Sequence, residues 1–408
     1  MKHLLPLLAF ALSACVSVDR PSPTLAAVER RAPVVILVSI DGLRPADLGR
    51  GNTPTLDALA REGASGAMRP SFPANTFPNH YTIVTGLRPD RHGVVDNTME
   101  DPARPGVRFT ISDAKQTRDR FWWDGAEPIW VTAERAGMRT GTMFWPGTEA
   151  AIGGVRPSVW VPYAADISSA ERVAFVLDWL RRPIAERPRL LTLYFDVVDK
   201  AAHEQGFESP EQDTAVRDVD AQLRRLREGL AAMGQVANLV VVSDHGMAAV
   251  PATNLIDPAG IADEAIMRTA QSGPILYAWP KPGAEAAVAA HVLRPRPHLT
   301  CRRREELPAR FHFGRHPRVP PFMCMADIGW RFSSPGGRAY LKGEHGYDPA
   351  DPSMRAVFIA AGPGFRAGSR IAEFDNVSVA ALLRDLLELP AGEGLDGTAA
   401  PFESARRR

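Results

Sequence analysis

Continuous apolar runs alternate with amphipathic helical patterns along most of this 408-residue chain. The run VVILVSI at residues 34–40 is rich in β-branched residues, which is typical of a strand buried on both faces of a sheet. The segment TPTLDALAREG at 53–63 has a threonine as N-cap, a proline at the first helical position and a terminal glycine, and therefore predicts a short helix. This alternation predicts a doubly wound α/β fold, with mostly parallel strands and helices on both faces of the sheet.

The same alternation continues to the end of the chain without an internal repeat. Apolar residues three and four apart predict a helix over 216–230, and NLVVVSDHG at 238–246 begins with another buried strand. No glycine-rich nucleotide-binding fingerprint follows any of the strands. We expect a single catalytic domain over 34–400, with a possible small lobe or insertion at 260–340, where a Pro- and Arg-rich sequence is typical of irregular, basic surface.

The balance of charge limits the class of binding partner. The chain has 48 basic and 47 acidic residues, a net charge of +1, and 45% hydrophobic residues. This near-neutral balance argues against a general polyanion binder, so we expect no nucleic-acid polymer as partner. The sequence implies no protein partner either, and a small anionic substrate would have to be held by a specific site.

The N-terminus has the pattern of an export signal. A short basic start precedes an apolar stretch over 4–12, which is too short to cross a bilayer. The segment LSAC, which ends at Cys15, resembles a bacterial lipoprotein cleavage box, and Val16 after it favours anchoring at the outer membrane. The alternative is an ordinary cleaved signal with an incidental cysteine. We therefore expect a signal over 1–15, a flexible tether over 16–33, and a periplasmic or outer-membrane-anchored lipoprotein.

Two further cysteines, Cys301 and Cys324, lie in the basic stretch. An oxidising compartment favours a disulfide between them, whereas two buried free thiols are the alternative. In either case we do not expect these cysteines to be catalytic.

Charged side chains follow three of the predicted strands. Asp41 follows the first strand, Asp244 and His245 follow the strand that starts at 238, and Asp199 follows a strand expected to end near Val198. Any one of these aspartates could simply cap a helix. However, ligands of such sheets sit at the carboxyl ends of the strands, so together these residues indicate a site.

Two histidines extend this set of candidate ligands. Asp199 and His203 are four residues apart, so on a helix they share a face and can hold one ion, although a surface pair is the alternative. His345 lies in the glycine-flanked turn GEHGYD, where an exposed loop histidine is the alternative. Oxygen and imidazole ligands without thiolates suit two divalent metals of the zinc type.

Thr76 stands in the segment PANTFPNHY, where the simplest interpretation is a turn that enters a helix, with Asn75 or Thr76 as N-cap. Two metals about 4 Å apart can clamp a phosphoryl centre, and in that setting a threonine hydroxyl becomes a usable nucleophile. A helix start adds a favourable dipole for its alkoxide.

Six segments, taken together and in order, resemble the nucleotide pyrophosphatase/phosphodiesterases of the alkaline phosphatase superfamily. These segments are VSIDGLRP, TPTLDALAREG, PSFPANTFPNHYTIVTGLRPDRHGVVDN, DVVDKAAHEQG, VVVSDHGM and GEHGYD. The resemblance extends from about Val35 to Ile359 and implies an alkaline-phosphatase-like fold in a bacterial exported member of the family.

The resemblance also implies the roles of individual residues. Asp196 competes with Asp199 as a ligand, but only Asp199 lies four residues before His203, as in the family motif. Trp145 is expected in the core or at the pocket floor. The implied ligands of two Zn²⁺ are Asp41, Thr76, Asp244 and His245 for one ion, and Asp199, His203 and His345 for the other. The implied substrate contacts are Thr76 as nucleophile, Asn97 as donor to a phosphate oxygen, and Phe77 and Tyr163 as walls of a slot for the base.

By the same resemblance, the chain hydrolyses nucleoside triphosphates, dinucleotides such as NAD, and nitrophenyl nucleotide esters to nucleoside 5'-monophosphates. A covalent threonine intermediate is implied, and the uncharged amide of Asn97 suits a diester. Choline-phosphodiester or lysophospholipid hydrolysis is the alternative, because relatives with those substrates share the metal ligands. A non-catalytic nucleotide- or metal-binding surface lipoprotein is the alternative from another class. Sulfatases are disfavoured because SFPANTF lacks their arginine.

Overall fold

The computed structural model describes residues 31–334 and 341–407, and residues 32–408 form one compact unit. The expected export signal, including Cys15, and most of the expected tether lie outside the described residues. None of the helices in the described ranges combines the length and hydropathy that crossing a bilayer requires.

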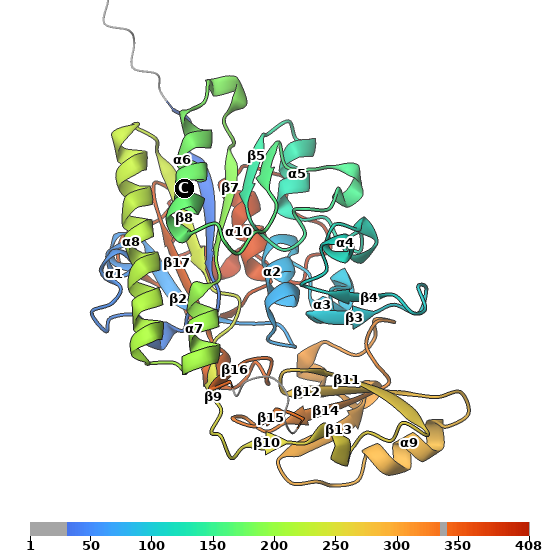
Figure 1. The fold of residues 1–408 in the computed structure, drawn as a ribbon. Helices are drawn as coiled ribbons and strands as arrows, with labels where there is room; N and C mark the ends of the chain where they lie inside the picture. The colour runs from blue at the N-terminus through green and yellow to red at the C-terminus, as the bar shows by residue number, and fades with distance from the viewer. Residues whose placement is uncertain (1–30, 335–340, 408) are drawn as a thin grey trace, which may run out of the picture. The chain divides into compact units, whose positions relative to one another are not determined.

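A nine-stranded sheet forms the centre of this unit (Figure 1). Its strands are β1 (Val34–Ile40), β2 (Ala64–Arg69), β5 (Thr140–Met143), β6 (Val159–Val161), β7 (Leu190–Phe195), β8 (Ala237–Val242), β17 (Ala356–Ala361), β18 (Ser369–Arg370) and β19 (Phe374–Asp375). The order is β18-β2-β17-β8-β1-β7-β5-β6, and β19 also pairs with β2. The strands from β8 to β6 are parallel, whereas β17 runs antiparallel to both of its neighbours. The predicted mostly parallel sheet is confirmed.

Helices cover both faces of the sheet, as the alternating pattern predicted (Figure 1). The helices of the described residues are α1 (Pro54–Glu62), α2 (Thr76–Thr85), α3 (Pro89–His92), α4 (Ala114–Thr117), α5 (Ile129–Arg135), α6 (Ser169–Arg181), α7 (Val197–Gln205), α8 (Pro210–Ala232), α9 (Glu285–Val292) and α10 (Ser378–Leu386). Of these, α9 packs away from the central sheet. Alternate residues of β1 enter two separate cores: Val35 and Leu37 pack with α2, α5 and α10, whereas Ile36 and Val38 pack with α1, α6 and α8. A strand buried on both faces needs the continuous apolar run that its sequence has.

A second, antiparallel sheet lies where the sequence suggested irregular surface. Its strands are β11 (Met267–Ser272), β12 (Ile275–Pro280), β13 (Leu299–Arg303) and β14 (Phe322–Ala326), in the order β11-β12-β14-β13. Cys301 and Cys324 face each other across β13 and β14 and form a disulfide. Of the two alternatives for these cysteines, the structure has the bonded pair.

Short strands complete the described chain. They are β3 (Thr98–Glu100) with β4 (Arg108–Thr110), β9 (Ala248–Ala249) with β16 (Gly343–Glu344), and β10 (Leu255–Ile256) with β15 (Arg331–Phe332).

The N-terminus of α1 is capped differently from the sequence prediction. Thr53 precedes Pro54 as predicted, but its side chain accepts no capping hydrogen bond. Instead, buried Asp220 of α8 accepts hydrogen bonds from the amides of Thr55 and Leu56 at 2.9–3.0 Å. A residue 165 positions away thus satisfies the free amides of the helix start and ties two helices of one face together.

Candidate functional site

Three parallel strands deliver candidate ligands to one edge of the sheet. Asp41 follows β1, and Asp244 and His245 lie just beyond β8. The strand before Asp199 ends at Phe195 rather than near Val198, so this part of the sequence prediction is wrong. Asp199 lies in the first turn of α7. Helix α7 starts at Val197, so Asp199 and His203 both lie on the helix and share one face.

Two further segments bring Thr76 and His345 to the same place. Thr76 is the first residue of α2, with Asn75 as the N-cap residue by backbone position, and it is buried. His345 follows β16 directly and donates from Nδ1 to the carbonyl of Ala74, 2.9 Å away. This hydrogen bond joins the turn that carries His345 to the segment that carries Thr76.

All seven predicted ligands, six of them acidic or imidazole groups, lie close together in this cluster. Thr76 Oγ1 is 3.4 Å from His245 Nε2, and His245 Nε2 is 3.6 Å from Asp41 Oδ1 and 3.0 Å from Asp244 Oδ2. On the other side, Asp199 is 3.5 Å from His203 Nε2 and 3.8 Å from His345 Nε2.

The three histidines all present the same nitrogen to the cluster. Nδ1 of His203 faces the carbonyl of Gly343 at 2.8 Å, and Nδ1 of His245 and of His345 face backbone carbonyls at 3.0 and 2.9 Å. Because a carbonyl can only accept, each Nδ1 must carry the hydrogen, which leaves the Nε2 lone pair for a ligand in a neutral imidazole. This arrangement is the usual one for metal-ligating histidines.

Each of the three carboxylates of the cluster has one oxygen without a hydrogen-bond partner among the described residues. These oxygens are Oδ1 of Asp41, Oδ1 of Asp199 and Oδ2 of Asp244, and all three are buried. Burial, together with repulsion from Asp244 and Asp199, raises the pKa of Asp41 well above its ordinary value. Burial also raises the pKa of Asp199. Three carboxylates, each with a buried oxygen that faces an imidazole Nε2 atom, fit divalent cations of the zinc type.

Neighbouring groups also shift the pKa values of Asp244 and His345. Burial works against charge on Asp244, yet His245 and His80 hold its pKa well below the ordinary value. Burial and the neighbouring His245 and His203 lower the pKa of His345 well below its usual range. His345 therefore stays neutral and keeps its Nε2 lone pair at physiological pH.

Two residues that the sequence did not indicate support the cluster. The Tyr194 hydroxyl donates to Asp41 Oδ2 at 2.6 Å. His80 is fully buried, with Nδ1 2.9 Å from the carbonyl of Thr76 and 3.3 Å from Asp244, and with Nε2 2.8 Å from Ser39 Oγ. Both nitrogens of His80 have protein partners, so neither is free to bind a metal. His80 instead holds the segment of Thr76 in place through its hydrogen bond to the Thr76 carbonyl.

A cavity of about 440 Å³ opens beside Thr76 and is lined by Phe77 and Tyr163 on its walls. Asp41 and Asp199 also reach it, and Trp145, which is 4% exposed, contributes to its lining as well as to the core. The volume lies within the usual range for small-molecule sites. The cavity therefore connects the ligand cluster with two aromatic side chains.

Tyr163 is anchored at the mouth of this cavity. It is 49% exposed, and its hydroxyl donates to Asp196 at 2.8 Å. Asp196 accepts at 2.6 Å from Arg172, which is 2% exposed and lies over the ring of Phe144. The Asp196 carboxylate is thus committed to Tyr163 and Arg172, which explains why Asp199 takes the place beside His203.

Asn97 is joined to Phe77, a lining residue of the cavity, by a hydrogen bond. Its Oδ1 accepts from the backbone amide of Phe77 at 2.9 Å, so its Nδ2 remains as a donor. Buried Asp96 beside it accepts from the Asn97 amide, from Ser272 at 2.6 Å, and from Tyr277. The small sheet thus holds the turn that carries Asn97.

Several residues that line the cavity gave no signal in the sequence. Arg118 pairs with Glu149 at 2.8 Å, and Glu149 also accepts from the backbone amide of Tyr163 at 2.9 Å. Ile111, 46% exposed, lies on the same loop region as Arg118. The sequence of this region shows no hydrophobic periodicity and no motif. Its residues could therefore be assigned to the cavity only from the structure.

Comparisons with known proteins agree with this fold and cluster. Residues 35–348 match the family described as type I phosphodiesterase / nucleotide pyrophosphatase. An uncharacterized pyrophosphatase/phosphodiesterase of Schizosaccharomyces pombe is 35% identical and covers 88% of this chain and 77% of that protein. Ectonucleotide pyrophosphatase/phosphodiesterase family member 1 of Rattus norvegicus is 33% identical over 92% of this chain, which spans only 43% of that relative.

A solved structure of human family member 5 superposes with a TM-score of 0.86 at 31% identity, covering 92% of this chain and all of that one. A murine member 5 structure with the same values is described as an inactive threonine-to-alanine variant in complex with AMP. Fold and cluster thus define an enzyme of the alkaline-phosphatase-like class. The chain belongs to the nucleotide pyrophosphatase/phosphodiesterase family.

Proposed function

We propose that this chain hydrolyses nucleotide pyrophosphate and phosphodiester bonds, such as those of nucleoside triphosphates and NAD, and releases nucleoside 5'-monophosphates. One observation carries the proposal: the Thr76 hydroxyl lies at a helix start, 3.4 Å from His245 Nε2, and borders the cavity that Phe77 and Tyr163 line. The AMP complex of the murine relative supports a nucleotide as substrate class.

Two Zn²⁺ would complete the site. Bound there, the ions would lower the pKa of oxygen nucleophiles and offset negative charge that develops on the phosphoryl group. The proposed ligands are Asp41, Thr76, Asp244 and His245 for one ion, and Asp199, His203 and His345 for the other.

The protein's own groups define the reaction in two displacements. Thr76 Oγ1 forms a bond to phosphorus as the bond to the leaving oxygen breaks, and the hydroxyl proton ends on the leaving group. A water molecule then forms the second new bond to phosphorus, and the departing Thr76 oxygen regains a proton. The products are a nucleoside 5'-monophosphate and the leaving group, which is pyrophosphate from a nucleoside triphosphate, a second nucleoside 5'-monophosphate from NAD, or an alcohol from an ester. The α2 start favours the Thr76 alkoxide, and Asn97 Nδ2 donates to a phosphate oxygen.

Phe77 and Tyr163 form the slot for the base in this proposal. Phe77 packs 5.9 Å from the rings of Phe109 and Trp123, and Tyr163 is anchored by Asp196. Both rings are therefore held in place before a substrate arrives. Stacking on such rings tolerates any base, so we expect weak base preference.

Replacing Tyr163 with alanine should raise KM for a nitrophenyl nucleotide ester roughly tenfold, because base stacking contributes about 1–3 kcal/mol. We expect kcat to change much less, since Tyr163 is half exposed and outside the ligand cluster. Bis(nitrophenyl) phosphate has no base, so its KM should stay the same in this variant. The exposed Phe175 of α6 supplies the matched control, Phe175→Ala. Equal losses on both substrates would argue against the slot.

A substrate comparison tests the proposed function directly. Zinc-loaded protein should hydrolyse ATP, NAD and a nitrophenyl nucleotide ester, with nucleoside 5'-monophosphate detected by liquid chromatography. Lysophosphatidylcholine should be a much poorer substrate. Preferred release of phosphocholine would instead support the phospholipid alternative, and binding of nucleotide without any zinc-dependent turnover would support the non-catalytic lipoprotein.

We also propose that residues 34–400 act as one catalytic domain that is exported to the periplasm. The apolar stretch over 4–12 and Cys15 support an export signal with a lipid anchor, and residues 16–33 would form the tether. The near-neutral balance of 48 basic and 47 acidic residues does not favour a nucleic-acid polymer as partner.

A further inference from the structure

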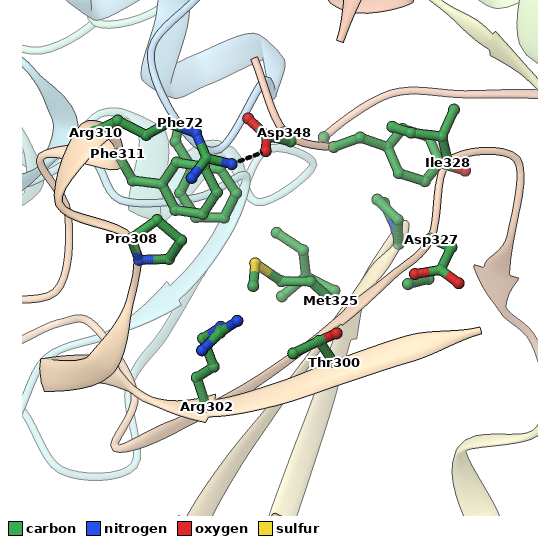
Figure 2. A pocket seen from close by; sticks show the side chains of 15 residues that line it. Phe72, Thr300, Arg302, Pro308, Arg310, Phe311, Met325, Asp327, Ile328 and Asp348 are labelled. Atoms are coloured by element: carbon green, nitrogen blue, oxygen red, sulfur yellow. Dashed lines mark hydrogen bonds and ion pairs between the residues drawn. The ribbon is translucent and has the colours of Figure 1, made fainter. Parts of the chain in front are cut away.

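A separate cavity of about 270 Å³ lies between the small sheet and loops of the main body (Figure 2). It shares no lining residue with the cavity beside Thr76. Its walls include Phe72 and Phe311 on one side and Thr300, Arg302 and Met325 of the small sheet on the other. Nothing in the proposed reaction uses these side chains.

The strand pattern presents Arg302 to this cavity. Along β13, Thr300 and Arg302 line the cavity. Leu299 points to the other face of the strand and packs in the core between the small sheet and α9. Arg303 lies over the ring of Phe322, 5.2 Å away, and does not line the cavity. Successive side chains of a strand point to opposite faces, so neighbouring arginines have different surroundings.

The charge of Arg302 is uncompensated among the described residues. Its Nε is buried without a hydrogen-bond partner, and no carboxylate forms an ion pair with it in the described part of the chain. Arg310 at the same cavity is paired with Asp348. The other acid, Asp327, has a 59% exposed side chain, so solvent screens it. The cavity therefore has one cationic end, at Arg302, that lacks a counter-charge.

Apolar side chains make up much of the remaining lining, and two of its aromatic rings stack on each other. Phe72 covers one face of Phe311 with ring centroids 4.1 Å apart, and the guanidinium of Arg310 lies 4.8 Å from the Phe311 centroid. Phe72 and Arg310 therefore both contact the Phe311 ring. Figure 2 shows Met325 near the middle of the cavity and Ile328, which is 41% exposed, at one end. An aliphatic body suits these walls better than a planar base.

We propose that this cavity binds a small organic anion, with a carboxylate or phosphate group paired to Arg302 and a short aliphatic body against Met325 and Ile328. A guanidinium fork matches both anionic groups with two parallel hydrogen bonds. The volume is just below the usual range for ligand cavities, which limits the body to a short chain. The inference does not depend on the proposed hydrolysis.

Isothermal titration with hexanoate, hexyl phosphate and inorganic phosphate tests the site. We expect hexanoate or hexyl phosphate to bind at least tenfold more tightly than inorganic phosphate, and the tighter of the two identifies the anionic group. Arg302→Gln should weaken that binding about tenfold or more, because it removes charge-assisted hydrogen bonds. Arg303→Gln, the neighbour on the opposite face, is the matched control and should bind as the parent protein does.

A second variant keeps the test decisive if Arg302→Gln folds poorly. Thr300→Trp fills the cavity from an exposed strand position while Arg302 stays in place, and it should abolish binding of the same anion. Thermal melting checks that each variant is folded. Absence of measurable binding of both hexyl probes by the parent protein would overturn the proposal, and so would unchanged binding in folded Arg302→Gln.

Discussion

Replacing Thr76 with alanine should lower turnover of a nitrophenyl nucleotide ester by roughly a thousandfold or more, as loss of a catalytic nucleophile does elsewhere. The Thr76 hydroxyl lies 3.4 Å from His245 Nε2 of the ligand cluster, and a methyl group cannot attack phosphorus. The helix itself should persist, because alanine favours helix and the N-cap position is occupied by Asn75 rather than by Thr76. Initial rates measured at saturating zinc give the comparison.

Two controls and two further measurements sharpen this result. Thr85→Ala removes a hydroxyl from the same helix that bonds only the Tyr81 carbonyl and the Leu87 amide, and it should leave turnover unchanged. Thr76→Ser keeps a hydroxyl and should keep part of the activity.

Metal content should stay near two ions per chain in all variants, by atomic emission. Intact-mass analysis should detect a nucleotidyl adduct in the parent protein but not in Thr76→Ala, and full activity of that variant would exclude Thr76 as nucleophile.

The sequence predicted those parts of the site that depend on local periodicity. β1 and β8 are continuous apolar runs, so their ends, and hence Asp41 and Asp244, could be placed within a residue. The Asp199–His203 spacing predicted a shared helical face, which α7 has. Each of these predictions needs only the geometry of one element.

Contacts between distant segments could not be predicted in this way. Tyr194 faces Ser39 in the register of β7 on β1, and only this pairing brings its hydroxyl to Asp41. Similarly, Asp196 contacts Tyr163 and Arg172 from two other elements. Whether an aspartate binds a metal or anchors a tyrosine depends on neighbours that its own segment does not reveal.

The small sheet was missed for a different physical reason. Its strand β13 contains arginines at two successive positions, Arg302 and Arg303, which sequence patterns assign to solvated loops. In the structure one arginine lines a cavity and the other lies on an aromatic ring, so long aliphatic stems cover apolar surface. The Cys301–Cys324 bond likewise follows from strand register, which spacing alone could not decide.

Removing metal with a chelator should abolish turnover and lower the melting temperature by roughly 5 °C or more, since a ligand that binds only the folded state at about a thousand times its Kd contributes about 4 kcal/mol. The loss of stability is expected from the charges of the candidate metal ligands. Three carboxylates have a buried oxygen without a hydrogen-bond partner among the described residues, and burial together with repulsion from Asp244 and Asp199 raises the pKa of Asp41. Without cations, this repulsion opposes folding. Differential scanning calorimetry before and after dialysis against chelator measures the shift.

Adding metal back separates this effect from general damage. Zn²⁺ should restore both activity and melting temperature, because imidazole Nε2 atoms of His203, His245 and His345 suit zinc. Mg²⁺ should restore neither, since it prefers oxygen ligands in an octahedral arrangement. The variant His345→Gln should lose affinity for one of the two ions and keep the other, because Asp41, Asp244 and His245 remain. Equal activity in chelated and zinc-loaded protein would contradict a metal-dependent site, and Mg²⁺ as the better activator would contradict zinc.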